Sequence, residues 1–444
     1  MGELLTLNAR VLTKAHHVKL VFQDSHRHTK AHANNSGYLM EQLLGSCAGL
    51  ISGNSWKAVK QAVQEPFLHK HTSVYVEDVR TFVHDYLRTR IPNETEQHGL
   101  QKFHIIHDLK FIPFLFVARI IFGPLSVGLE RKLEALIPQR EALFRKVIQG
   151  GMSRFALLRH LPLSEMNELR DFKRRWKSWN DEAHTHALLN ATDSNGAPIL
   201  DMYADMETGK ITQEQLLQTI DEILFANLDV MMNGLSWVLV FLAANISVQA
   251  DLREEIRANE SPELRATYLS GPGLSSTTLL TACILESARL RPAAAFSVPQ
   301  SCPTARNLDG YEVPAGTNFV IDSYALNIRD PFWGKDRDKF QPRRWKKLAN
   351  NRDLRYQYWR FGFGPRTCMG KYVADLILKA TIVEVLNKWQ ISLSDTTKGF
   401  SHQTDKGMPR ADEDCDMDWP WDDEMWIHHP DMTLYCTAFS PNVP

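Results

Sequence analysis

The sequence predicts a mainly helical protein with a small β part, an α+β fold, and three observations carry that prediction. From about residue 54 to residue 300, apolar residues recur at three- and four-residue spacing between long charged faces, as amphipathic helices require. After Pro292 the pattern changes to short segments separated by turn residues, which is typical of strands. Helical periodicity returns beyond Gly370 before short strands end the chain, so helices outweigh strands.

The first elements are small. Apolar and polar residues alternate over residues 4–7 and 11–13, which predicts two short strands, and a helix is expected over Ala15–Phe22. Farther along, Thr212 is placed to cap a helix that runs on to Ala244. This would be an unusually long and apolar central helix.

Two apolar stretches, residues 111–129 and 223–248, raise the question of a membrane span. Arg119 interrupts the first, and Asp229 together with asparagine side chains interrupts the second. Charged side chains are costly inside a bilayer, so we expect both stretches to be buried core helices.

The last third of the chain carries a hairpin signal. Asp309-Gly310 lies between the strand-like segments Arg306–Leu308 and Tyr311–Val313, and this dipeptide favours a two-residue hairpin turn. The other elements expected here are a strand over Asn318–Ile321, an irregular stretch over 327–361, a helix after Gly370 and a strand over 433–439.

Composition bounds the class of protein. The chain has 444 residues, of which 43% are hydrophobic, and no Pro/Gly/Ser-rich linker or repeat divides it, so we expect one domain over residues 1–444. A net charge of -1 provides no global field that would attract nucleic acid or an anionic membrane. Six scattered cysteines without a C-x-x-C pair favour a reducing compartment over a disulfide scaffold.

Residues 361–370, FGFGPRTCMG, form the most informative segment. Its three glycines permit tight bends that turn amide N–H groups toward the Cys368 sulfur, and the following helix adds its positive end. Such a loop stabilises a thiolate that can bind a metal, and Arg366 is placed to meet an anion on the same face. A glycine-rich turn with an incidental cysteine is the alternative, and this combination of residues disfavours it.

This segment resembles the haem loop of the cytochrome P450 haem-thiolate monooxygenases, F-G-x-G-x-R-x-C-x-G. Every fixed position is matched, by Phe361, Gly362, Gly364, Arg366, Cys368 and Gly370. The resemblance implies the cytochrome P450 fold, a haem b cofactor whose iron takes Cys368 as axial ligand, and Phe361, Gly362, Arg366 and Gly370 around that cofactor. It also implies electrons from NADPH through a reductase.

A second motif resembles the family's E-x-x-R. Glu286 and Arg289 stand at i and i+3 on one helix face, where they can pair. The resemblance adds Arg344, from the segment FQPRRW at 340–345, as the third member of a structural charge network that is costly to break. The usual glutamate of that segment is Arg343 here.

Trp56 and Lys60 resemble the family's W-x-x-x-R/K helix, which contacts a haem propionate. The alternative is an amphipathic helix with a core tryptophan. Because this tryptophan lies much farther from the N-terminus in familiar members, we expect that the membrane anchor, the proline-rich hinge and the first helix are missing. The resemblance implies the cytosolic face of the endoplasmic reticulum membrane, whereas a chain without an anchor would be soluble and cytoplasmic.

The central helix departs from the family's A-G-x-D/E-T-T pattern. Ala226 and Asp229 keep it, but Asn227 replaces the glycine and Val230 replaces the threonine that assists proton delivery. Because valine has no hydroxyl, Asp229, Asn227, ordered water or the substrate must deliver protons, which makes Asp229 and Asn227 the catalytic candidates. Three functions stay open: a monooxygenase, an oxidative coupling or ring-forming enzyme that inserts no oxygen, and an isomerase-like or non-catalytic haem-binding protein.

The resemblance places substrate contacts in the central helix, in the segment 292–298 and in the segment 32–53, which includes Asn34, Asn35, Tyr38, Leu39 and Met40. Small residues in the last segment suggest room above the iron, with Phe296 as a wall. The overall texture is similar to fungal secondary-metabolite members, and more narrowly to those that act on diketopiperazine toxins. We therefore expect the protein to oxidise a small apolar or aromatic metabolite, such as a mycotoxin precursor.

Two charged segments complete the analysis. Residues 335–360 carry ten Lys/Arg against three Asp, and the resemblance makes this the docking face for an NADPH-cytochrome reductase, with a solvated basic face as the alternative. The acidic segment 412–424, which holds Trp419 and Trp421, is expected to be an exposed loop near the substrate entrance.

Overall fold

The computed structural model describes residues 9–31, 37–91, 100–156, 164–192, 196–271, 278–349, 351–393, 427 and 429–439. The strand expected over residues 4–7 and the acidic segment 412–424 lie outside these residues. Within the described part of the chain, the prediction of a mainly helical α+β fold is confirmed.

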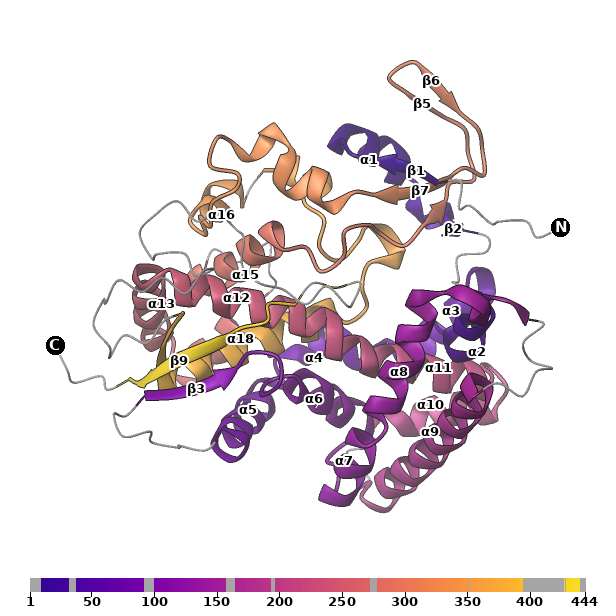
Figure 1. Ribbon diagram of the computed structural model, residues 1–444, viewed down its shortest axis with the longest axis horizontal. Coiled ribbons are helices and arrows are strands. Elements are labelled where there is room, and N and C mark those ends of the chain that lie inside the picture. Colours follow the sequence, from indigo (N-terminus) through magenta and orange to yellow (C-terminus); the bar gives the residue numbers. More distant parts are fainter. Residues whose placement is uncertain are drawn as a thin grey trace.

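Helices make up most of the described chain, and in Figure 1 most of those in the first half of the sequence lie below the central helix. The first ten are α1 (Ala15–Phe22), α2 (Tyr38–Leu44), α3 (Gly53–Val63), α4 (His69–Thr72), α5 (Val76–Arg90), α6 (Phe111–Phe122), α7 (Val127–Glu134), α8 (Ile137–Gln149), α9 (Ser164–Leu189) and α10 (Pro198–Glu207). The others are α11 (Gln213–Ala226), α12 (Met232–Ala244), α13 (Ile246–Ala258), α14 (Pro262–Ser270), α15 (Leu279–Leu290), α16 (Arg344–Leu348), α17 (Leu354–Gln357) and α18 (Lys371–Lys388).

The described strands form three small sheets. The sheet orders are β1-β7-β4-β2, β3-β9-β8 and β5-β6. The strands are β1 (Ala9–Leu12), β2 (Thr29–Lys30), β3 (Leu100–His104), β4 (Gln300–Ser301), β5 (Arg306–Leu308), β6 (Tyr311–Val313), β7 (Asn318–Ile321), β8 (Trp389–Ser392) and β9 (Thr433–Ala438). β1 runs parallel to β7, with Leu12 opposite Ile321, so the N-terminal segment joins a strand some three hundred residues later.

The central helix is continuous across α11 and α12, as expected, and Thr212 caps it. The Thr212 hydroxyl accepts from the Gln215 N–H while the Gln215 side chain accepts from the Thr212 N–H, a complete capping box. The structure adds a feature that periodicity did not predict, a π-helical turn over Asn227–Met231. Such turns occur preferentially at functional sites, and this one holds both catalytic candidates.

The two apolar stretches are core helices. Among the described residues, one helix, Gln213–Ala244, is long and apolar enough to cross a membrane, and 72% of its most apolar window is buried inside the protein. α6 is buried along most of its length, and Arg119 near its end pairs with Glu130 at 2.8 Å. Both therefore contribute to the protein's own core.

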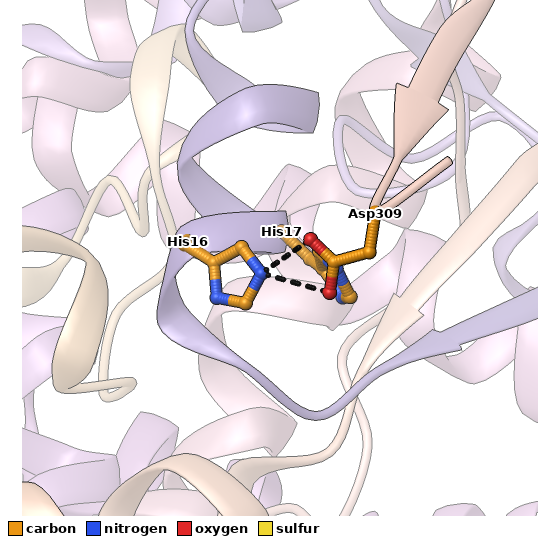
Figure 2. A group of neighbouring side chains, drawn as sticks. All are labelled: His16, His17 and Asp309. Carbon is orange, nitrogen blue, oxygen red and sulfur yellow. Dashed lines mark hydrogen bonds and ion pairs between the residues drawn. The ribbon is translucent and has the colours of Figure 1, made fainter. Parts of the chain in front are cut away.

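The hairpin prediction is confirmed, and the turn is tied to α1. Asp309 and Gly310 both have positive φ, of 52° and 91°, as the predicted turn requires. Figure 2 shows His16 and His17, from the first turn of α1, meeting the Asp309 carboxylate at 3.0 Å and 2.9 Å. These imidazoles hold the pKa of Asp309 below its usual value, and the contact joins α1 to the hairpin.

The stretch 327–361 contains two short helices, α16 and α17, where the sequence predicted irregular chain. Helices of four or five residues are too short to display a 3.6-residue period, so the pattern could not reveal them.

Candidate active site

A cavity of about 670 Å³ lies between the central helix and the loop that carries Cys368. Its lining brings together the residues that the sequence singled out for the cofactor and for proton delivery. These are Trp56, Lys60, Asn227, Asp229, Phe361, Gly362, Arg366, Cys368 and Gly370. The structure therefore gathers nine predicted site residues from three separate parts of the chain around one space.

The cysteine loop is bent as its glycines predicted, at two positions. Gly362 and Gly364 have φ of 82° and 69°, a region that strongly favours glycine, and the Cys368 N–H donates to the Phe361 carbonyl at 2.8 Å to close the loop. Gly370 has an ordinary φ of -81°, and a Cβ added there would meet no atom within 4 Å. Gly370 lines the cavity, so its missing side chain leaves space for a bound group.

The loop rests on the N-terminal segment. A Cβ added at Gly364 would overlap the side chain of Ser25, and Phe363 meets Phe22 edge to face at 5.8 Å between ring centroids. Gly364 is therefore required twice, once for its backbone conformation and once for this close approach.

The Cys368 thiol opens onto the cavity. Desolvation by the surrounding protein raises its pKa above the ordinary value, while the Gly370 N–H and the nearby Arg360 and Lys371 act in the opposite direction. A bound metal ion deprotonates a coordinating thiol outright, and the Gly370 N–H and the two cations would then stabilise the thiolate.

Cations gather at one end of the cavity around Trp56. The Arg366 guanidinium lies 4.3 Å from the Trp56 ring centroid and the Lys60 ammonium lies 5.0 Å from it. Lys60 Nζ also donates to the Pro365 carbonyl at 2.9 Å, and Arg366 donates to the Ile51 carbonyl and to Ser52 Oγ. Desolvation lowers the pKa of both Lys60 and Arg366, which means that burial disfavours their positive charges. An anion bound at this end would stabilise those charges.

Sequence reasoning missed a third cation, Lys30 of β2. It lines the same cavity, and burial, followed by the charge of Arg366, lowers its pKa to about 8. Lys30 stands in a two-residue strand with no motif around it, so only its position opposite Gln300 in the sheet brings it to the site.

These features fit haem. The cavity supplies a thiol on one face that could bind the haem iron, and mainly apolar walls that suit the porphyrin ring. Its three cations, Lys30, Lys60 and Arg366, could pair with the two negatively charged propionate groups of a haem. Cys368 would hold the iron, while Arg366, Lys60 and Trp56 would hold the propionate edge.

The opposite wall is the π turn of the central helix. Asn227 lines the cavity and donates one of its side-chain amide N–H groups to the Ile223 carbonyl, so this hydrogen bond ties the side chain to its own helix. Burial, with the charge of Glu141 adding to it, raises the pKa of Asp229 to about 6. Val230 lines the same cavity, is 37% exposed and offers no hydroxyl, so Asp229 is the one titratable side chain of the Asn227–Met231 turn.

Only some residues of the predicted substrate segments line the cavity. Met40 lines the cavity, and so do most residues from Pro292 to Val298, including Phe296. Leu39 is instead buried in the hydrophobic core, and Asn34 and Asn35 lie outside the described residues. Most of the lining from this part of the chain comes from residues 47–50, which the sequence did not single out individually.

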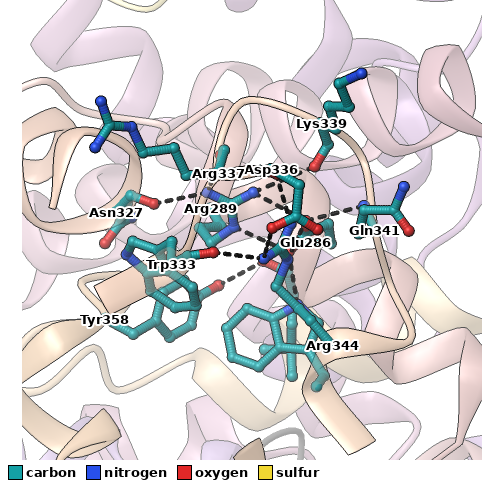
Figure 3. Close-up of polar contacts among 12 residues, drawn as sticks. Glu286, Arg289, Asn327, Trp333, Asp336, Arg337, Lys339, Gln341, Arg344 and Tyr358 are labelled. Carbon is teal, nitrogen blue, oxygen red and sulfur yellow. Dashed lines mark hydrogen bonds and ion pairs between the residues drawn. The ribbon is translucent and has the colours of Figure 1, made fainter. Parts of the chain in front are cut away.

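Glu286, Arg289 and Arg344 lie together outside the cavity lining (Figure 3). Glu286 Oε1 accepts from Arg289 Nη2 and from Arg344 Nε, each at 2.9 Å, and Oε2 accepts from Arg289 Nε at 2.9 Å. Trp345 Nε1 and the Gln341 N–H also donate to Glu286. The carboxylate is fully buried, so the network ties α15 to the segment that leads into the cysteine loop.

The basic segment 335–360 presents eight of its ten cations to solvent. Arg344 belongs to the buried network, and Arg360 pairs with Asp375 at 2.6 Å and lines the cavity. Arg360 was predicted as part of a surface patch, and the structure makes it a neighbour of the thiol instead.

Comparisons with known proteins agree with this geometry. The cytochrome P450 family model matches residues 4–410. The chain is 41% identical over 427 residues to the cytochrome P450 monooxygenase aclC of Aspergillus oryzae, covering 96% of this chain and 82% of that one. It is 39% identical over 392 residues to the cytochrome P450 monooxygenase gliC of Aspergillus fumigatus, covering 86% and 75%.

A solved zebrafish cytochrome P450, determined with abiraterone, superposes with a TM-score of 0.68 over 98% of this chain and 94% of that one, at 16% identity. This structural similarity shows the fold, whereas the match to the family model and the identity with the fungal relatives show the family. A chain with this fold, this thiol-facing cavity and these relatives belongs to the cytochrome P450 family.

Proposed function

We propose that this protein oxidises a small apolar or aromatic secondary metabolite of the diketopiperazine type. Family membership makes it a haem monooxygenase that uses haem b, a redox partner reductase and a small-molecule substrate. The observation that carries the proposal is the cavity itself, where the Cys368 thiol faces mainly apolar walls with Asp229 on the far side.

The chemistry divides between the cofactor and the chain. When bound, the haem supplies oxygen activation, and a thiolate ligand favours O–O cleavage. The chain's own walls exclude water and orient the substrate, and Asp229 holds a proton near pH 6 at its carboxyl oxygen. A diketopiperazine would suit this lining, because an amide N–H could donate to a carboxyl oxygen of Asp229 and its apolar edges could meet Phe296 and Ala294.

The absorption spectrum of the reduced protein under carbon monoxide tests the thiolate ligand. A long-wavelength Soret band that Cys368→Ala abolishes would support it, and a short-wavelength band in the parent protein would contradict it. Turnover of a cyclic dipeptide with reductase and NADPH, followed by mass spectrometry, then tests the substrate class. A haem-loaded protein that consumes NADPH without altering any cyclic dipeptide would refute that part.

A second candidate reaction is oxidative coupling or ring formation without oxygen insertion. Val230 favours it, because the chain lacks the hydroxyl that assists proton delivery in the usual family pattern. Turnover under ¹⁸O₂ separates the two reactions, since a monooxygenase product gains one labelled oxygen and a coupled product gains none.

We also propose that the reductase docks on the exposed cations of 335–360, beside the cysteine loop, and that the protein works at the cytosolic face of the endoplasmic reticulum. Replacing both exposed lysines of α16, by Lys346→Glu with Lys347→Glu, should slow reduction by the reductase and flatten its salt dependence, with chemical reduction unchanged. Equal reductase rates in the variant would exclude this face, and cell fractionation tests the location.

A further inference from the structure

The segment between α2 and α3, residues 45–52, forms one wall of the active-site cavity. Cys47, Ala48, Gly49 and Leu50 all line the space, yet the segment contains neither helix nor strand. Its own turn bonds serve the N–H groups of Cys47, Leu50 and Ile51. The N–H groups of Ser46, Ala48 and Gly49 must therefore find partners elsewhere.

α11 supplies those partners from one face. The Ser46 N–H donates to Gln218 Oε1 at 2.6 Å, and the Ala48 N–H donates to Thr219 Oγ1 at 3.1 Å. The Gly49 N–H donates to Glu222 Oε2 at 2.9 Å. Because residues 218, 219 and 222 lie at adjoining positions on a helix surface, they act as one row of acceptors for the wall.

Glu222 is the member of this row that carries a carboxyl group. Burial raises its pKa, while the Gly49 N–H, the Cys47 thiol and the Lys30 ammonium act to lower it. Glu222 and Lys30 both line the cavity, so this carboxylate links α11, the wall and β2. A charge-assisted hydrogen bond in such surroundings is stronger than the neutral ones beside it.

Gly49 is shaped to receive Glu222. A Cβ added at Gly49 would overlap the Glu222 carboxylate, although the backbone φ of Gly49 is one that any residue can adopt. The absence of a side chain at this position therefore serves the approach of the carboxylate and not a turn.

We propose that Glu222 is a positioning residue that fixes the 45–52 wall and thereby limits the size of the molecules that reach the iron. The limit on access to the iron rests on the proposed function, whereas the hydrogen bonds that hold the wall do not depend on which substrate binds. α11 leads into the π turn with Asp229, so the same helix holds the wall and the proton-holding group.

Haem-loaded Glu222→Ala should release the wall. We expect hydrogen exchange of the 46, 48 and 49 amides to accelerate at least about tenfold, because a hydrogen bond to a charged group is lost. A bulky triphenyl-substituted imidazole should bind the iron at least about tenfold faster, while imidazole itself binds as before. Glu222→Gln keeps the acceptor and should largely restore both values, and exposed Glu254→Ala on α13 is the matched control.

A double-mutant cycle that combines Gly49→Ala with Glu222→Ala is the decisive test. Alone, Gly49→Ala should displace the carboxylate and reproduce the Glu222→Ala exchange and azole rates, whereas in the Glu222→Ala background it should add almost nothing. Additive effects, or unchanged exchange and azole rates in Glu222→Ala, would overturn the proposal. If Glu222→Ala fails to retain haem, Glu222→Gln and Gly49→Ala carry the same comparison. A parent protein that lacks the thiolate Soret band would instead count against the proposed function alone.

Discussion

Replacing Glu286 by glutamine should destabilise the protein severely without changing the shape of the side chain. Glu286 accepts hydrogen bonds from Arg289 and Arg344, from Trp345 and from the Gln341 N–H, and its side chain has no solvent exposure. The substitution leaves two guanidinium groups without their shared counter-charge. Removing one partner of a buried ion pair costs about 3–5 kcal/mol, so we expect a loss of that size in the free energy of unfolding.

Denaturant titration of the haem-loaded protein, followed by circular dichroism and by the Soret band, measures this loss. The matched control is Glu182→Gln, because Glu182 pairs with Lys132 at 2.6 Å but both side chains are about half exposed. Such surface pairs contribute less than about 1 kcal/mol. Equal midpoints for the two variants would refute the reasoning. If Glu286→Gln yields no folded protein, Trp345→Phe removes one donor and should cost about 1.5–3 kcal/mol.

Three further predictions follow from the cavity. The pKa of Asp229 is about 6 in the folded protein against an ordinary 3.8, so the folded state keeps a proton that the unfolded chain releases, and stability falls as pH rises through that interval. Asp229→Asn should flatten this fall, seen in unfolding midpoints, and an unchanged slope would contradict the assignment. Val230→Thr restores a hydroxyl and should raise the ratio of product to NADPH consumed, and an unaltered ratio would exclude this position from proton delivery. Lys60→Gln should speed haem transfer to apomyoglobin about tenfold, with exposed Lys57→Gln as control, because a charge-assisted bond contributes about 1.5 kcal/mol.

The sequence predicted those parts of the site that depend on fixed spacing within one segment. Cys368 and Arg366 share a loop, and Glu286 and Arg289 share a helix turn, so local rules place each pair. The Asp309-Gly310 hairpin was predictable for the same reason, because two adjacent residues set the turn. Such features require no knowledge of how the chain folds back on itself.

Lys30 and Glu222 could not be predicted in this way. Each reaches the cavity through tertiary packing, Lys30 by pairing opposite Gln300 and Glu222 by facing Gly49 across 173 positions. The π turn at 227–231 was also hidden, because the helix that follows it is buried on nearly all sides and therefore has no one-sided apolar pattern in which a change of phase could be seen. Arg360 shows the opposite error, since a run of basic residues concealed its separate partner Asp375.

The contact between Ser25 and Gly364 has a consequence for how the protein assembles. The cysteine loop rests on a segment that is synthesised long before it, and β1 pairs with β7 only after the roughly three hundred residues between them have been made. Contacts between residues so far apart in the sequence slow folding, because the chain must lose the entropy of closing a long loop before the contacts can stabilise it. The thiol side of the cavity is therefore expected to be among the last regions to acquire its final geometry, so haem capture should report on completion of the fold and not on its beginning.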